Sequence, residues 1–154
     1  MFHIITRWFW LAFIATTFAN AAVWWKRAQP YIEKRPELEP GYRQLIRNFL
    51  FFSNIPWIVM GVGILGGAMP GIFHYFNAKS GPFAIAWYAS IVMLQVLLMW
   101  WIFFRRGAET LVEYPGYFNN EISPRTIKTF VLLTPIGLII YSVTFFTANI
   151  RLPP

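Results

Sequence analysis

The chain contains no cysteine and no aspartate, and its only acidic side chains are six glutamates. The absence of cysteine excludes disulfides, thiolate metal sites, iron–sulfur clusters and cysteine nucleophiles. Charged residues make up 12% of the sequence, which is about half the share found in an average globular protein. Histidine occurs only twice, so the sequence offers few ligands for a metal and few candidates for a general base.

Apolar residues take the place of the missing charge. Hydrophobic residues form 57% of the 154 positions, and aromatic residues alone form 20%. A water-soluble domain of this length could not bury so much apolar surface, whereas the hydrocarbon of a bilayer accommodates it. The composition therefore predicts an integral membrane protein.

The net charge of +7 raises the question of nucleic-acid binding. That function needs a basic patch together with aromatic side chains that bases can stack on. Here the aromatic residues lie inside apolar runs, and the cations lie between those runs. We therefore expect the cations to face the lipid bilayer, including its anionic headgroups, and we expect no nucleic-acid partner.

Four segments approach the length of about 20 apolar residues that a helix needs to cross a bilayer. None carries a charge in its interior, and tryptophans near their ends suit the headgroup layer. The segments are 8–25, 49–68, 82–104 and 127–148. The sequence predicts an all-α, polytopic integral membrane protein, with a single transmembrane domain built as a four-helix bundle.

The first of these segments resembles a signal peptide, since small residues at 19–21 follow an apolar stretch. Its apolar run continues to Trp25 and stops at Lys26, as that of a spanning helix would. We therefore expect the segment to be retained as the first span.

Two prolines lie inside predicted spans, Pro56 in the second and Pro135 in the fourth. Each should kink its helix and free one backbone carbonyl. A freed carbonyl in lipid needs a new donor. Ser53, Asn54 and Thr134 are close enough in sequence to supply one.

The cations are distributed unevenly between the two sides of the membrane. Six lie in the connection 26–48, and four lie in or beside the connection 105–126, whereas the opposite side has three. The positive-inside bias places both connections in the cytoplasm, or in the matrix or stroma, and both termini outside. A bacterial inner membrane, or its thylakoid or mitochondrial equivalent, fits this arrangement.

The two connections share a sequence pattern. Trp24-Trp25 precedes Glu39-Pro40-Gly41-Tyr42, and Trp100-Trp101 precedes Tyr114-Pro115-Gly116-Tyr117. A tandem repeat of two helical hairpins would produce this pattern. Tryptophans at span ends and Pro-Gly turns are also common by themselves, so both interpretations stay open.

Small residues recur in the first two spans at helical spacing, where they let helix backbones approach closely. We expect a helix–helix contact there, either within the chain or with a partner. The residues are Ala12, Ala15, Ala19 and Ala22 in the first span, and Gly63 and Gly67 in the second.

Few residues could bind a ligand. His74 lies outside the membrane in the predicted topology, where no carboxylate accompanies it, so neither a metal site nor a hydrolytic triad is expected. Asn54 and Gln95 are the most polar side chains inside the spans; they could bridge helices or anchor a ligand. Glu109 and Glu113, four residues apart, are expected to pair with neighbouring arginines.

No cofactor is predicted, although a quinone, a pigment or a haem remains open. The sequence indicates a non-catalytic accessory, scaffold or assembly subunit of a larger membrane complex, because buried charge and catalytic groups are both missing. The alternative is the binding or transport of a neutral hydrophobic molecule, such as a quinone, a lipid or a pigment. A membrane enzyme is the third hypothesis, for which no catalytic residue is assigned.

Overall fold

The computed structural model describes residues 2–117 and 122–147. Every regular element in these two ranges is helical, which confirms the all-α prediction. The four long helices are α1 (Phe2–Lys34), α2 (Glu39–Leu65), α3 (Pro82–Phe104) and α5 (Pro124–Thr147). They are connected by the 3₁₀ helices η1 (Pro36–Leu38), η2 (Ile72–Phe76) and η3 (Ala78–Ser80), and by the short helix α4 (Gly107–Glu113).

The connection 26–48 is mostly helical, although it lies outside the apolar runs. α1 ends at Lys34 because Pro36 disfavours a helical conformation at the preceding residue, and Arg35 has a φ of −142°. Pro40 is tolerated in the first turn of α2, where a backbone N–H has no helical acceptor. The first predicted span is therefore the central part of α1, whereas the second covers the C-terminal part of α2 and was predicted three residues too long, since α2 ends at Leu65.

Three helical segments are long and apolar enough to cross a membrane: Pro36–Leu65, Pro82–Phe104 and Pro124–Thr147. The structure therefore supports an integral membrane protein. At 33 residues α1 is also long enough, but it falls outside this group because tryptophans, threonines and Asn20 interrupt its apolar residues.

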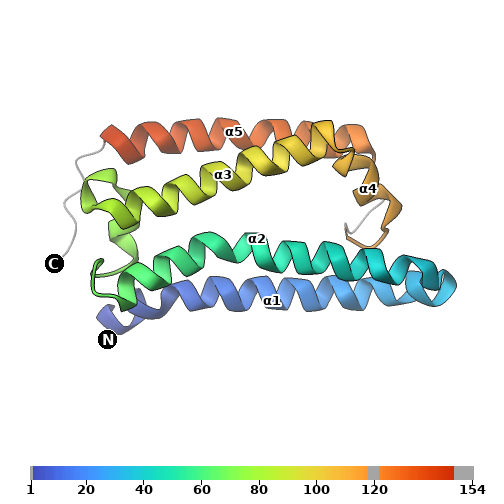
Figure 1. The fold of residues 1–154 in the computed structure, drawn as a ribbon, viewed down its shortest axis with the longest axis horizontal. Helices are drawn as coiled ribbons and strands as arrows, with labels where there is room; N and C mark the ends of the chain where they lie inside the picture. Colours follow the sequence, from blue (N-terminus) through green and yellow to red (C-terminus); the bar gives the residue numbers. More distant parts are fainter. Residues whose placement is uncertain (1, 118–121, 148–154) are drawn as a thin grey trace.

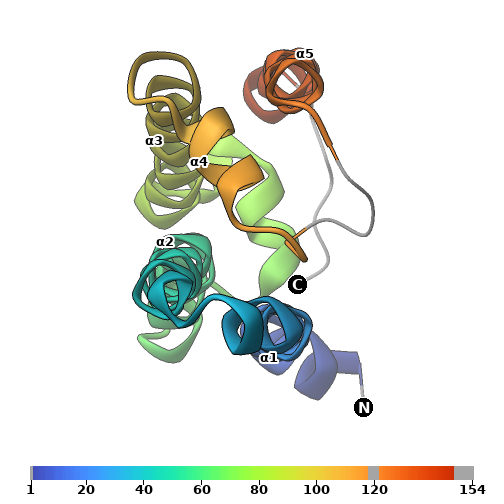
Figure 2. The same ribbon diagram turned by 90° about the vertical axis from the view of Figure 1, so that its right-hand side faces the viewer.

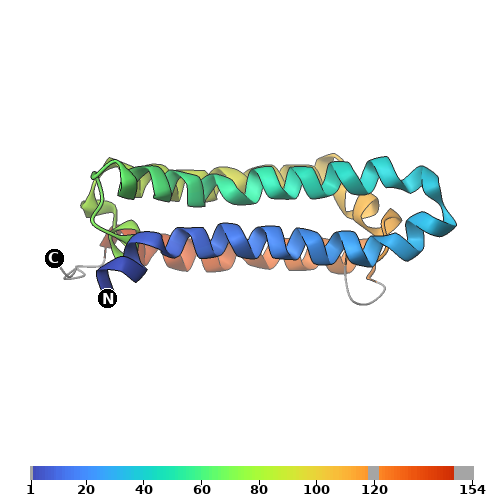
Figure 3. The same ribbon diagram turned by 90° about the horizontal axis from the view of Figure 1, so that it is seen from below.

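The long helices pack in chain order, with α1 along α2, α2 along α3, and α3 along α5 (Figure 1). α1 and α5 make at most marginal contact, and the end-on view in Figure 2 shows these two helices apart from each other. The α1–α2 connection and α4 lie at one end of the molecule, so the two cation-rich connections share that end. Figure 3 shows that the α1–α2 tip extends beyond α4 there.

The two Pro-Gly-Tyr segments contact each other at this end. Tyr42 Oη donates a hydrogen bond to the carbonyl oxygen of Pro115 at 2.6 Å. The Tyr114 ring lies against Gly41 and meets the Tyr42 ring edge-on, with centroids 5.0 Å apart. Gly116, at a φ of +91°, lies against the α1 backbone in a conformation that favours glycine. Together these contacts fasten the second connection to the tip of the α1–α2 hairpin.

The two halves nevertheless differ in local structure. Pro40 belongs to the first turn of α2, whereas Pro115 follows α4, and the described part of the first connection has no helix like α4. Tyr117 packs on Trp24 with ring centroids 4.5 Å apart, and burial raises the pKa of the Tyr117 phenol. The shared sequence pattern thus produces two different structures that pack on one another.

Pro135 frees the carbonyl oxygen of Val131, and a neighbouring side chain donates a hydrogen bond to this oxygen. Thr134 Oγ1 donates to that oxygen at 2.8 Å. Gln95 Nε2, on α3, donates to Thr134 Oγ1 at 2.6 Å. The role expected of Thr134 is confirmed, and the structure adds a link from that role to α3.

The arrangement at Pro56 differs from this. Pro56 frees the carbonyl of Phe52, whereas Asn54 Nδ2 donates to the carbonyl oxygen of Leu50 at 2.7 Å. Asn54 is buried, and its Nδ2 group donates to a carbonyl of its own helix, so this nitrogen does not bridge to another helix.

We expect Thr134→Val to weaken the packing of α5 on α3 by about 1 kcal/mol, the size of interhelical side-chain hydrogen bonds in membranes. Valine keeps the shape but leaves the Gln95 amide and the Val131 carbonyl without their partner. The measurement is the unfolding free energy in mixed micelles. Thr144→Val is the matched control, because the Thr144 hydroxyl donates to the Ile140 carbonyl of its own helix and, among the described residues, bonds to no other helix. Equal losses in the two variants would contradict the prediction.

Candidate functional site

One face of α1 packs along α2. Its buried residues recur at Thr17, Ala21, Ala28 and Ile32. Near the start of the helix, the Trp10 ring lies against Gly61 of α2. One turn further on, Phe13 stacks on Trp57 with ring centroids 3.9 Å apart. The intramolecular contact of α1 is therefore built on this face.

The alanine seam predicted from the sequence lies on a different face. Ala12, Ala15, Ala19 and Ala22 are all exposed, and a turn of 100° per residue places them roughly opposite the buried set. The alanines of this seam are not buried against α2. Its small residues are left uncovered by the part of the chain that the structure describes.

Asn20 lies beside this seam. Its side chain is exposed and forms no hydrogen bond within residues 2–117 and 122–147. Thr16, one turn earlier, satisfies its own hydroxyl by donating to the Ala12 carbonyl oxygen at 2.8 Å. The Asn20 amide is thus a free donor and acceptor in the middle of an apolar stretch.

The two glycines predicted to form a second packing motif are separated by the end of α2. Gly63 lies inside the helix, where the Tyr75 hydroxyl and the Phe83 ring occupy the space next to its Cα. Gly67 lies beyond Leu65, the last residue of α2, and has a φ of +75° with nothing close to it. Only Gly63 serves close packing, and it does so within the chain.

The three candidate ligand anchors lie in separate surroundings. His74 lies in η2, and its Nδ1 is buried without a hydrogen bond. Asn54 bonds to Leu50, whereas Gln95 bonds to Thr134. Gln95 also lines an open groove of about 260 Å³ between α2 and α3.

Glu109 pairs with a lysine on another helix, not with the neighbouring arginines. Its Oε1 lies 2.7 Å from Lys128 Nζ, an ion pair that joins α4 to α5. Hydrogen bonding to Lys128 lowers the pKa of Glu109. In the part of the chain that the structure describes, no three histidine or glutamate side chains gather closely enough to hold a metal ion.

Comparison with known proteins yields no relative: the chain matches no protein-family model, no curated protein and no solved structure.

Proposed function

We propose that this chain is a non-catalytic accessory or assembly subunit that binds a helix of another membrane protein through the exposed face of α1. The observation that carries the proposal is the free Asn20 amide beside an exposed row of four alanines. Small residues let two helices approach closely, and an asparagine side chain hydrogen-bonds across such a contact.

The composition of α1 supports this function. The other three long helices are apolar enough to face lipid, whereas α1 is less so. An unpaired amide in hydrocarbon costs free energy. A partner helix on this face would shield Asn20 from lipid and give its amide a hydrogen-bonding group.

The same proposal includes the topology. α1 serves as a fourth span, the two cation-rich connections face the cytoplasm or its equivalent, and both termini face out. The common end of the two connections supports it, since the ten cations then meet one surface of the membrane. The membrane is a bacterial inner membrane or the thylakoid or mitochondrial equivalent.

Affinity purification from native membranes in mild detergent tests the proposal. We expect a membrane protein to co-purify with the wild-type chain, and Ala15→Phe or Asn20→Leu to reduce its recovery about tenfold, which corresponds to roughly 1.4 kcal/mol. Asn20→Leu should leave the stability of the isolated chain unchanged, because the wild-type amide has no partner among the residues that the structure describes.

Ala89→Phe, at an exposed position of α3, is the matched control and should retain the partner. Quantitative purification of the wild-type chain alone would contradict the proposal. So would equal losses in the α1 and α3 variants.

A second candidate function is the binding of a neutral hydrophobic molecule, such as a quinone, a lipid or a pigment. The groove between α2 and α3 favours it, since Ser53 and Gln95 lie among its apolar lining. An absorbance spectrum and an analysis of extracted lipids from the purified protein would reveal such a ligand, and their absence would remove this candidate.

A further inference from the structure

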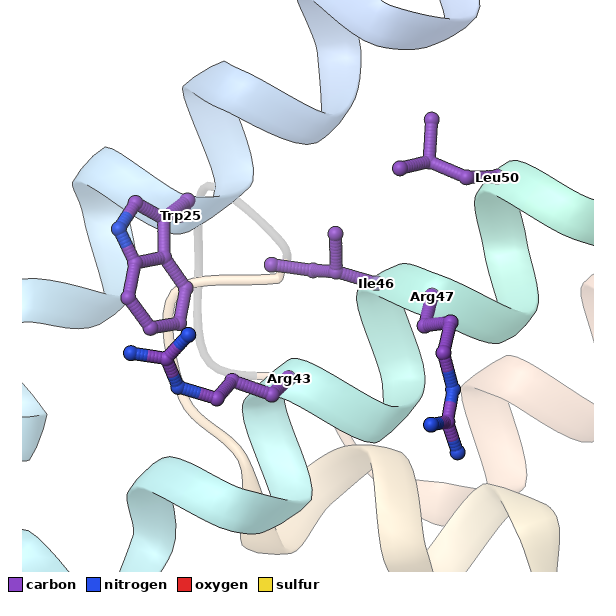
Figure 4. A pocket seen from close by; sticks show the side chains of 5 residues that line it. All are labelled: Trp25, Arg43, Ile46, Arg47 and Leu50. Atoms are coloured by element: carbon purple, nitrogen blue, oxygen red, sulfur yellow. The ribbon is translucent and has the colours of Figure 1, made fainter.

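A second groove lies between α1 and α2 near the tip of their hairpin, with a volume of about 320 Å³. Figure 4 shows its lining, in which Trp25 comes from α1 and the other four residues come from α2. Those four are Arg43, Ile46, Arg47 and Leu50. The groove is open along its side and lies at the cation-rich end of the molecule.

The lining changes from charged to apolar along α2. Arg43 and Arg47 are one helical turn apart, as are Ile46 and Leu50. At 1.5 Å per residue, Arg43 and Leu50 are about 10 Å apart along the helix axis. Leu50 is at the start of the apolar run, and Trp25 is at the end of the first one. This order matches the passage from a lipid headgroup to its acyl chain.

The two guanidinium groups are available to an anion. Arg43 lies over the Trp25 ring, 4.9 Å from its centroid, and pairs with Glu39 at 2.6 Å. Both members of that pair are exposed, so the pair itself is weak. Arg47 forms no ion pair with any residue in the described ranges. It turns away from Trp25 in Figure 4, and its exposed side chain is free to rotate toward the groove.

We propose that this groove binds an anionic phospholipid. The phosphate contacts Arg43 and Arg47, the headgroup edge lies against Trp25, and one acyl chain follows Ile46 and Leu50. Basic side chains between membrane helices bind anionic headgroups in this manner. The proposal requires the hairpin tip to lie in the headgroup layer, and it is independent of the partner helix on α1.

The test uses the full chain in lipid nanodiscs, with phosphatidylglycerol compared with phosphatidylcholine by native mass spectrometry. We expect the wild-type chain to retain phosphatidylglycerol preferentially. Arg43→Gln with Arg47→Gln should lower that preference about tenfold or more, since each arginine near the surface contributes on the order of 1 kcal/mol. Glu39→Gln should raise the preference, because it removes a competing carboxylate from Arg43.

The matched control replaces Arg27 and Arg35 by glutamine; both lie near the α1–α2 connection, and neither lines the groove. An equal loss of the preference for phosphatidylglycerol in both double variants would show that the lipid is attracted by the basic end of the molecule in general. That result would overturn the proposal. Two other outcomes would also overturn it: a wild-type chain without preference, and displacement of the lipid by glycerol phosphate alone, which would identify a simple anion site. A decrease with Glu39→Gln would contradict the assigned role of Arg43.

Discussion

Replacing Gly63 by alanine is expected to destabilise the folded chain by about 3 kcal/mol, the combined cost of overpacking and of a lost buried hydrogen bond. A Cβ at this position would lie 2.0 Å from the Tyr75 hydroxyl oxygen and 2.8 Å from the Phe83 ring. Tyr75 has no solvent exposure, and its hydroxyl donates to the Met60 carbonyl oxygen at 3.0 Å. The ring therefore cannot move aside without leaving the core between η2, α2 and α3.

The measurement is the unfolding free energy in mixed micelles, with Gly137→Ala as the control. A Cβ at Gly137 would meet nothing within 4 Å, so that variant should be neutral or slightly stabilising, since alanine favours a helix more than glycine does. Adding Tyr75→Phe should recover part of the loss from Gly63→Ala, because phenylalanine lacks the oxygen that the new Cβ approaches most closely. Strictly additive losses in the double variant would show that this contact is not the cause.

Gly41→Ala is the second large effect expected, at about 2 kcal/mol for a Cβ forced into packed side chains. The added atom would lie 2.0 Å from the Tyr114 hydroxyl oxygen and 2.3 Å from the ring carbon that carries it. Displacing Tyr114 would also weaken its edge contact with Tyr42 and the hydrogen bond from Tyr42 to Pro115. The second connection would then detach from the hairpin tip.

Limited proteolysis measures this detachment, since cleavage between α4 and α5 should become faster in Gly41→Ala. Tyr42→Phe should give a smaller increase, because it removes one hydrogen bond and leaves the glycine contact in place. Gly67→Ala is unsuitable as a control because its φ is +75°, so Gly137→Ala serves again. Unchanged cleavage in Gly41→Ala would refute the role assigned to this contact.

The apolar runs were predictable because the length and polarity of a span depend only on consecutive residues of the sequence. The same holds for Thr134, since a proline frees the carbonyl four residues earlier and the neighbouring hydroxyl is within reach by local geometry alone. The bond from Gln95 to Thr134 joins residues on different helices. Nothing in the local sequence specifies which helix faces which.

The outcome for the small residues shows this limit most clearly. Helical spacing identified Ala12, Ala15, Ala19 and Ala22 as one face, but the face that packs on α2 is the one with Thr17 and Ala21. Both faces carry small residues at suitable spacing, so the pattern alone could not choose between them. The contact of Trp10 with Gly61 shows which face of α1 packs on α2, and that contact depends on the register of the two helices.

The helical connection 26–48 also escaped prediction. Its polar composition indicates that it lies outside hydrocarbon, but charged residues such as lysine, arginine and glutamate form helices readily in water. Pro30 lies inside α1 without ending it, and Pro40 belongs to the first turn of α2. Ligand anchors were harder still, because His74, Asn54 and Gln95 were chosen for polarity and the fold gives each a separate environment.

The weak attachment of α5 has a consequence for how the chain is made. Only 11% of the apolar window of α5 is buried, against 33% for the segment that contains α2. α5 follows α1, α2 and α3 in the chain, so these three helices can associate before α5 is synthesised. The window of α5 is the least buried of the three candidate spans, so we expect a smaller opening free energy for α5 than for the segment that contains α2. Until α5 docks on α3, the Gln95 amide lacks its partner Thr134. This hydrogen bond therefore distinguishes the docked state of α5 from the undocked state.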